Sequence, residues 1–172
     1  THNMLSPASG DPLVAPTLDM VMGCYYLTQI REGAEGEGME FFDFDETRVA
    51  HDSGLVDLQA RIRVLQLPSQ GSMDLDQGPV ETTLGRLIFN ETLPEAVDYQ
   101  NKLMDRAALK DLTSELCRVL DSQDMAAALD RIKHLGFHYA TTSGITIAIN
   151  DIQVSSKKPQ ILEDADDLVA GY

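Results

Sequence analysis

The sequence predicts an α+β fold, with short mixed or antiparallel strands and helices in the first part and a helical second part. Three observations support this prediction. Apolar and charged residues alternate over 60–67, and residues 80–83 begin a second such run, which is typical of half-buried strands. From Leu109 onward, apolar residues recur at helical spacing. The repeating strand–helix units of a parallel α/β fold are absent from the pattern.

The chain is expected to open with irregular structure followed by a helix. Residues 5–16 contain three prolines, which favours an extended, turn-rich segment. Thr17 is the predicted N-cap of the helix, and Asp19 in the first turn suits the positive end of the helix dipole. The helix is expected to end near residues 29–31, before the glycine-rich residues 33–38.

Short elements are expected between this helix and residue 100. Residues 39–43 predict a strand and residues 45–51 a helix of one or two turns. The half-buried strand over 60–67 is followed by a polar, acidic surface loop over 68–78. The next strand begins at Val80 and is expected to give way to a helix from Leu84.

Amphipathic helices dominate the predicted second part. The first helix presents an apolar face made of Leu109, Leu112, Leu116 and Val119. The second presents a face made of Met125, Ala128, Leu129 and Ile132. Gly136 is expected to stop the second helix, and residues 145–149 are expected to form a strand or a tightly packed extended segment. Pro159, at a first helical turn, starts a final acidic helix.

The net charge, the apolar runs and the cysteine spacing limit which functions and locations are expected for this chain. The net charge of −15 predicts that the chain does not bind DNA or RNA by itself, because nonspecific affinity for nucleic acid comes from neutralising phosphates with Lys and Arg. There is no signal peptide and no apolar run near eighteen residues, so a cytoplasmic location is expected rather than secretion or a membrane span. Cys24 and Cys117 lack metal-type spacing and are expected to be reduced, buried residues.

One short motif offers an enzymatic alternative. Asp43, Asp45 and Thr47 form an Asp-x-Asp-x-Thr pattern after an apolar strand, as in Mg²⁺-dependent phosphatases that use an aspartate nucleophile. Asp166 and Asp167 could serve as the downstream metal carboxylates. Such a fold needs a parallel sheet of strand–helix units, which this chain lacks. The structural alternative is a strand end followed by Asp45 as a helix cap.

Several segments in order resemble the β′ subunit of bacterial RNA polymerase. Residues 5–12 read Leu-Ser-Pro-Ala-Ser-Gly-Asp-Pro and residues 24–28 read Cys-Tyr-Tyr-Leu-Thr, which is similar to the region after the magnesium-binding Asn-Ala-Asp-Phe-Asp-Gly-Asp motif of that family. Gly-Glu-Gly-Met at 36–39, Glu-Thr-Thr-Leu-Gly-Arg at 81–86 and Tyr-Ala-Thr at 139–141 match further family patterns. The family's metal motif itself is not in the sequence. The resemblance therefore implies no cofactor and no catalytic residue in this segment, with Mg²⁺ bound by residues outside it.

The resemblance implies a role in transcription for three successive portions. Residues 1–100 would form an α+β pore or secondary-channel portion, residues 101–158 a helical portion, and residues 159–172 the start of a coiled-coil helix at the channel rim. The implied function is that of a noncatalytic segment of a nucleotidyltransferase that synthesises RNA from a DNA template. It would line the channel through which NTPs enter and the RNA 3′ end of backtracked complexes protrudes.

The implied partners are the β and α subunits and the transcript-cleavage and other secondary-channel factors. An alternative in a different class is a docking module for such factors or for neighbouring subunits. The resemblance gives substrate-channel candidates at Ser9, Asp11, Leu18, Asp19 and Arg86. Ser9 and Leu18 stand where the family usually has Asn and Gln, so a polar contact from position 18 to a nucleotide is not implied. For Arg86, the alternative is a structural ion pair.

A regulatory pocket is a further implication. In some family members, the positions of Asp130 and His134 contribute to a pocket for guanosine tetraphosphate, with Tyr where His134 stands here. The alternative is a pair of polar residues on a helix surface. His134 and His138 are not expected to act together, because Gly136 is predicted to break the helix between them.

Overall fold

The computed structural model describes residues 12, 14–67, 78–146, 149–152 and 155–170. The α-helices are α1 (Asp19–Thr28), α2 (Phe44–Asp52), α3 (Leu84–Glu91), α4 (Arg106–Val119), α5 (Ser122–Ser143) and α6 (Lys158–Ala170). The strands are β1 (Glu40–Phe41), β2 (Ile62–Val64) and β3 (Val80–Thr82), and a 3-10 helix covers Ile149–Asp151. This confirms the α+β prediction, including the mostly helical second part.

The three strands form one mixed sheet in the order β1-β2-β3. β2 pairs in parallel with β1 and antiparallel with β3. Ile62 and Val64 are fully buried, while Arg63 between them is exposed and forms an ion pair with Glu40 on β1. The half-buried strand predicted from the alternation is therefore confirmed, although it is shorter than the pattern suggested.

The packing of α1 on α5 depends on two glycines. A Cβ added to Gly23 of α1 would lie 1.8 Å from the carbonyl oxygen of Gly136 on α5, and one added to Gly136 would lie 2.6 Å from that of Met20. The prediction that Gly136 ends a helix is therefore wrong. α5 continues to Ser143 and ends at Gly144, which has φ 61°. Gly136 is inside the helix because the backbone of α1 occupies the space a side chain would need.

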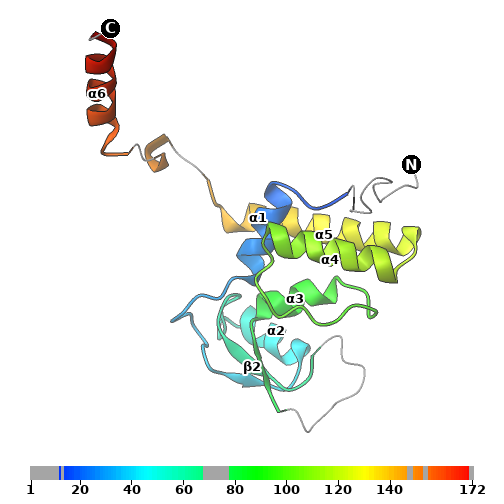
Figure 1. Cartoon of the computed structure of the whole chain (residues 1–172). Coiled ribbons are helices and arrows are strands. Elements are labelled where there is room, and N and C mark those ends of the chain that lie inside the picture. Colours follow the sequence, from blue (N-terminus) through cyan, green and yellow to red (C-terminus); the bar gives the residue numbers. More distant parts are fainter. Residues whose placement is uncertain (1–11, 13, 68–77, 147–148, 153–154, 171–172) are drawn as a thin grey trace.

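Apart from α6, the helices and the sheet form layers that share one core. Figure 1 shows α3 between the α4–α5 layer and the part of the chain that contains α2 and the sheet. Gly85 at the start of α3 allows a close approach to α1, because a Cβ there would lie 1.9 Å from the carbonyl oxygen of Leu27. The buried cluster contains residues of both predicted portions, such as Leu27 and Leu87 from the first and Leu112 and Ile132 from the second. Both portions therefore contribute to one buried cluster.

Several other boundaries are close to their predictions. α1 ends at Thr28, β1 lies within 39–43, and α2 is followed by Gly54 in a left-handed conformation at φ 73°. β3 leads into α3 at Leu84, with the hydroxyl of Thr83 capping the helix. Except for Gly78, the predicted surface loop over 68–78 lies outside the described residues.

Two predicted helix caps are wrong. The N-cap of α1 is Leu18 rather than Thr17, and no side chain caps this helix. Leu18 has φ 50°, so the helix begins one residue later than the polar pattern suggested. α2 is capped by Asp43 rather than Asp45, since an Asp43 carboxylate oxygen accepts the N–H of Glu46 at 2.9 Å.

Two predicted apolar positions and one predicted strand are also wrong. Val119 is 49% exposed at the last turn of α4, and Cys117 is only partly buried. In the described part of residues 145–149, Ile145 is not in a strand and Ile149 begins the 3-10 helix, 87% exposed. Figure 1 shows the chain leaving α5 on the side away from the sheet, so none of the described strands lies beside the described residues of this segment.

α6 lies apart from the other helices. It begins with Pro159 in its first turn, as predicted, and all of its residues are exposed. Figure 1 shows α6 away from the other helices. Its apolar positions Ile161, Leu162, Leu168 and Val169 are 54–75% exposed. The amphipathic pattern is present, but this chain does not bury it.

Candidate functional site

Arg86, a predicted channel residue, lies in the interior rather than on a surface. Its side chain is on α3, and the residue is only 9% exposed. Its Nε donates to the carbonyl oxygen of Thr28 at 3.1 Å, and its Nη1 donates to the main-chain and side-chain oxygens of Asn101 at 3.2 and 3.0 Å. In the described part of the chain, these partners are neutral, so the ion pair expected for Arg86 is not formed. Burial lowers the pKa of the guanidinium.

Thr28 connects the end of α1 to two other segments. Its hydroxyl donates to the carbonyl of Cys24 and accepts the backbone N–H of Met104, both at 2.8 Å. Its own carbonyl accepts from Arg86. Thr28 and Met104 are fully buried, so water cannot bond to their polar groups. These hydrogen bonds satisfy those groups instead. The network fixes the carboxyl end of α1 against α3 and the segment before α4.

Leu18 and Asp19 lie together at the opposite, amino end of α1. Leu18 is 85% exposed, and it is the one described residue other than glycine with a positive φ. Asp19 is exposed in the first turn. Ser9 and Asp11 lie outside the described residues, so the structure places two of the five channel candidates at this helix end and a third, Arg86, at the other end.

The predicted regulatory residues lie one helical turn apart on α5. Asp130 and His134 are both exposed, and the ammonium of Lys133 lies 2.5 Å from a carboxylate oxygen of Asp130. This hydrogen bond lowers the pKa of Asp130. Gly136, two residues after His134, contacts Met20 of α1. That this pair binds a nucleotide stays a prediction.

A cavity of about 500 Å³ lies where three segments of the chain meet. It is lined by Tyr26, Glu35, His51, Gly54, Val56, Asp57, Leu58, His138, Tyr139 and Thr142. These residues come from α1, from the end of α2 with the loops around it, and from the last turns of α5. No local motif could have predicted this site, because the segments lie far apart in the sequence.

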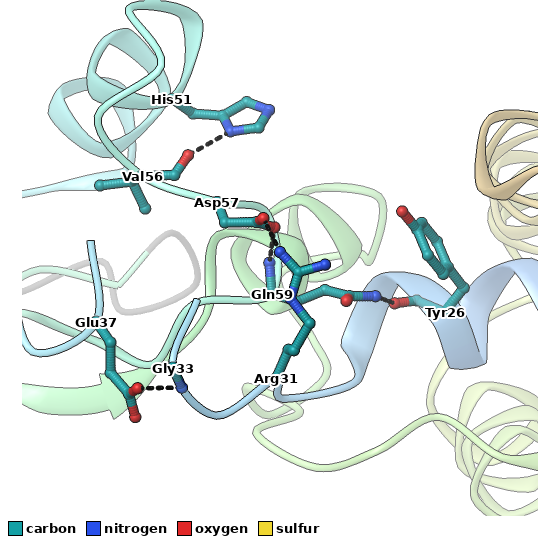
Figure 2. A network of polar contacts seen from close by, with 8 residues as sticks. All are labelled: Tyr26, Arg31, Gly33, Glu37, His51, Val56, Asp57 and Gln59. Carbon is teal, nitrogen blue, oxygen red and sulfur yellow. Dashed lines mark hydrogen bonds and ion pairs between the residues drawn. The ribbon is translucent and has the colours of Figure 1, made fainter. Parts of the chain in front are cut away.

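Hydrogen bonds hold one side of this cavity in place. The Gln59 side-chain amide donates to the carbonyl of Tyr26 at 2.5 Å, and Arg31 forms an ion pair with Asp57. His51 Nδ1 lies 2.7 Å from the carbonyl oxygen of Val56. Figure 2 shows this network together with the bond from the Gly33 N–H to Glu37. Burial raises the pKa of Tyr139, on the opposite wall of the cavity.

The Asp-x-Asp-x-Thr motif is not arranged as a phosphatase site. Asp43 is used as the cap of α2, and the Thr47 hydroxyl donates to the Asp43 carbonyl at 2.8 Å. Asp166 and Asp167 belong to α6, which Figure 1 shows far from α2. Within the described residues, no three His, Cys, Asp or Glu side chains are placed to hold one metal ion.

None of the helices described is long and apolar enough to cross a membrane.

Comparison with known proteins gives consistent matches. The family model described as RNA polymerase Rpb1, domain 3, matches residues 3–152. The DNA-directed RNA polymerase subunit beta′ of Dehalococcoides mccartyi is 47% identical over 169 residues, which cover 98% of this chain and 12% of that protein. The subunits of the same name from Desulforudis audaxviator and Salinibacter ruber are 44% and 37% identical, over 96% and 98% of this chain. The chain spans 11–14% of the length of these relatives.

Proposed function

Because this chain belongs to the beta′ subunit family of bacterial DNA-directed RNA polymerase, within Rpb1 domain 3, we propose that it serves RNA synthesis as a noncatalytic segment of that subunit. In this proposal it forms part of the wall of the secondary channel, where NTPs enter and the RNA 3′ end of a backtracked complex protrudes. The catalytic Mg²⁺ is bound by residues outside this segment, and the β and α subunits are its neighbours.

The observation that carries the proposal is the amino end of α1. A leucine with positive φ costs on the order of 1–3 kcal/mol unless surrounding structure holds it. Leu18 takes that conformation while 85% exposed, and no side chain caps the helix that follows. Strained residues concentrate at functional sites. An exposed, strained leucine beside Asp19 is what we expect of a residue that contacts a passing nucleotide or a neighbouring element.

The interior supports the proposal by making this helix end rigid. Gly23 and Gly136 bring α1 into backbone contact with α5, and Arg86 with Thr28 anchors its other end. A wall that positions a substrate path needs such fixed support. In this account Arg86 is a positioning residue that acts through α1, since its guanidinium is occupied by protein oxygens.

The acidic composition is consistent with a wall rather than a binding cleft. A net charge of −15 disfavours capture of triphosphates, so the basic groups that hold an NTP must come from other parts of the enzyme. A channel wall that bound NTPs tightly would release them slowly and so limit RNA synthesis. The proposed segment guides NTPs by shape and leaves the phosphate contacts to the catalytic region.

A second candidate function is the docking of transcript-cleavage and related factors. α6 presents four apolar side chains that are 54–75% exposed, on a helix that no other described element covers. A short isolated helix is marginal in water, so this face favours a partner. The proposal places factor docking at α6 and substrate passage at α1.

A chimeric polymerase tests the channel role. Residues 3–152 replace the matching segment of the Dehalococcoides mccartyi subunit, and nucleotide addition is measured with Leu18→Trp and with Leu18→Gly. The larger side chain is expected to raise the apparent KM for NTPs several-fold, and the glycine variant is not. Val119→Trp, at an exposed position on α4, is the control and should leave KM unchanged. Equal KM values for all three variants would refute the channel role.

A further inference from the structure

The cavity between α1, α2 and α5 is rich in hydrogen-bond acceptors. Tyr26 and Tyr139 contribute phenol rings from α1 and α5, and Glu35 and Asp57 contribute carboxylates from the loops. The loops are joined, because the Asp57 N–H donates to the carbonyl of Glu35 at 2.9 Å. A volume of about 500 Å³ is enough for a long polar side chain. Nothing in the proposed channel role uses this cavity.

His51 adds a fixed acceptor to the lining. Its Nδ1 lies 2.7 Å from the Val56 carbonyl oxygen, which can only accept, so Nδ1 carries the proton. In the neutral imidazole, Nε2 is then a bare acceptor. Figure 2 shows the second ring nitrogen of His51 pointing away from Val56. A ligand at this wall is expected to be a donor.

The two carboxylates differ in their partners. Asp57 already forms an ion pair with the guanidinium of Arg31 at the edge of the cavity. Glu35 has no ion pair with any described residue, although it lines the same cavity. When the imidazoles are neutral, the charges of Glu35, Asp57 and Arg31 sum to −1. An anion would be repelled here, and a cation would replace water beside Glu35.

We propose that this cavity binds the guanidinium of an arginine side chain carried by another polypeptide. A guanidinium presents five N–H donors in a plane, which suits acceptors spread over Glu35 and His51, and its flat face stacks on tyrosine rings such as Tyr26 and Tyr139. An ammonium ion lacks the flat face and presents fewer donors. The choice of a polypeptide rests on the proposed function, since assembly into a polymerase places other segments and subunits around this chain.

Peptide titration of the 172-residue chain tests this site. Amide NMR signals are followed while acetyl-Ala-Arg-Ala-amide is added, with the citrulline peptide as a neutral control of the same shape and the lysine peptide as a second cation. We expect saturable shifts at Glu35, Asp57 and Tyr139 with the arginine peptide. Binding should be at least fivefold weaker with the other two.

Two variants distinguish binding at this site from nonspecific attraction of a cationic peptide to an acidic protein. Glu35→Gln should weaken binding of the arginine peptide at least threefold, whereas Glu32→Gln, in the same loop but not in the cavity lining, should leave it unchanged. Equal weakening by both variants, equal binding of the citrulline or lysine peptide, or no saturable shift would overturn the proposal. These readouts need no polymerase, so they can fail while the channel test succeeds.

Discussion

The Arg86 side chain on α3 donates from Nε to the backbone carbonyl of Thr28 at the last residue of α1, over 3.1 Å. The same guanidinium reaches Asn101, and the Thr28 hydroxyl accepts the N–H of Met104. One buried cation therefore connects three segments that are far apart in the sequence. This connection holds the helix whose opposite end carries Leu18.

Arg86→Lys should destabilise the chain by about 2–4 kcal/mol, since a lysine cannot replace the fork of donors that reaches both the buried Thr28 carbonyl and Asn101. Urea denaturation of the 172-residue chain measures this loss. Arg63→Lys is the matched control, because Arg63 forms an exposed ion pair with Glu40. Its loss should stay below about 1 kcal/mol. Similar losses for both variants would show that the buried network is not specific to arginine.

Gly136→Ala should destabilise the chain by roughly 3 kcal/mol or more, because the added methyl would meet the backbone of Met20, which can move only by separating α1 from α5. Gly144→Ala tests glycine loss where nothing lies within 4 Å of the added Cβ. There, only the left-handed backbone opposes alanine, at about 1 kcal/mol. Thermal unfolding of both variants makes the comparison. If Gly136→Ala is no worse than the control, the helix crossing is not as close as described.

Alkaline pH should destabilise the chain through one buried acid and one partly buried acid. Burial raises the pKa of the Cys24 thiol from 9.0 to about 12 and that of the Tyr99 phenol from 10.0 to about 12. The unfolded state therefore loses these protons at a lower pH than the folded state does. The free energy of unfolding falls as pH rises above 9 and levels off near 12. Each group contributes roughly 1.4 kcal/mol per pH unit within its range. Tyr99→Phe and Cys24→Ala should each flatten the decline in urea-measured stability between pH 9 and 11; an unchanged slope would contradict these shifts.

α6 should exchange its amide hydrogens rapidly. All of its residues are exposed, whereas α4 buries Leu109, Leu112 and Leu116. Hydrogen exchange of the 172-residue chain, read by mass spectrometry, should show α6 protected far less than α4. Comparable protection of the two helices would mean that α6 packs on a surface and is not free to receive a docking factor.

Local patterns predicted the elements that local forces determine. The alternation around Ile62 and the start of a helix at Leu84 are features of short-range structure, and both predictions are confirmed. Gly136 was interpreted as a helix stop because glycine lowers helix propensity, but the close approach of α1 decides its role. Arg86 was expected on a channel or in an ion pair, and its partners Thr28 and Asn101 lie 58 and 15 residues away. Such long-range contacts leave no periodic signal in the sequence.

The candidate sites show the same difference between what can be predicted from the sequence and what depends on long-range contacts. Family resemblance gave Leu18 and Asp19, and the structure adds that they share an exposed helix end. The cavity around His51 was not predicted, because its lining comes from three separate segments that meet only through the helix crossing. The fold brings His51 of α2 and His138 of α5 to the same cavity.

The proposed channel role is tested most directly by crosslinking from the amino end of α1. A photoreactive amino acid replaces Leu18 in the chimeric polymerase, and a second enzyme carries it at Val119, an exposed position on α4. Complexes are backtracked so that a labelled RNA 3′ end leaves the catalytic centre. The label is expected to be transferred to position 18 and not to position 119. Transfer to neither position, or to both equally, would contradict the claim that this helix end lines the path of the RNA.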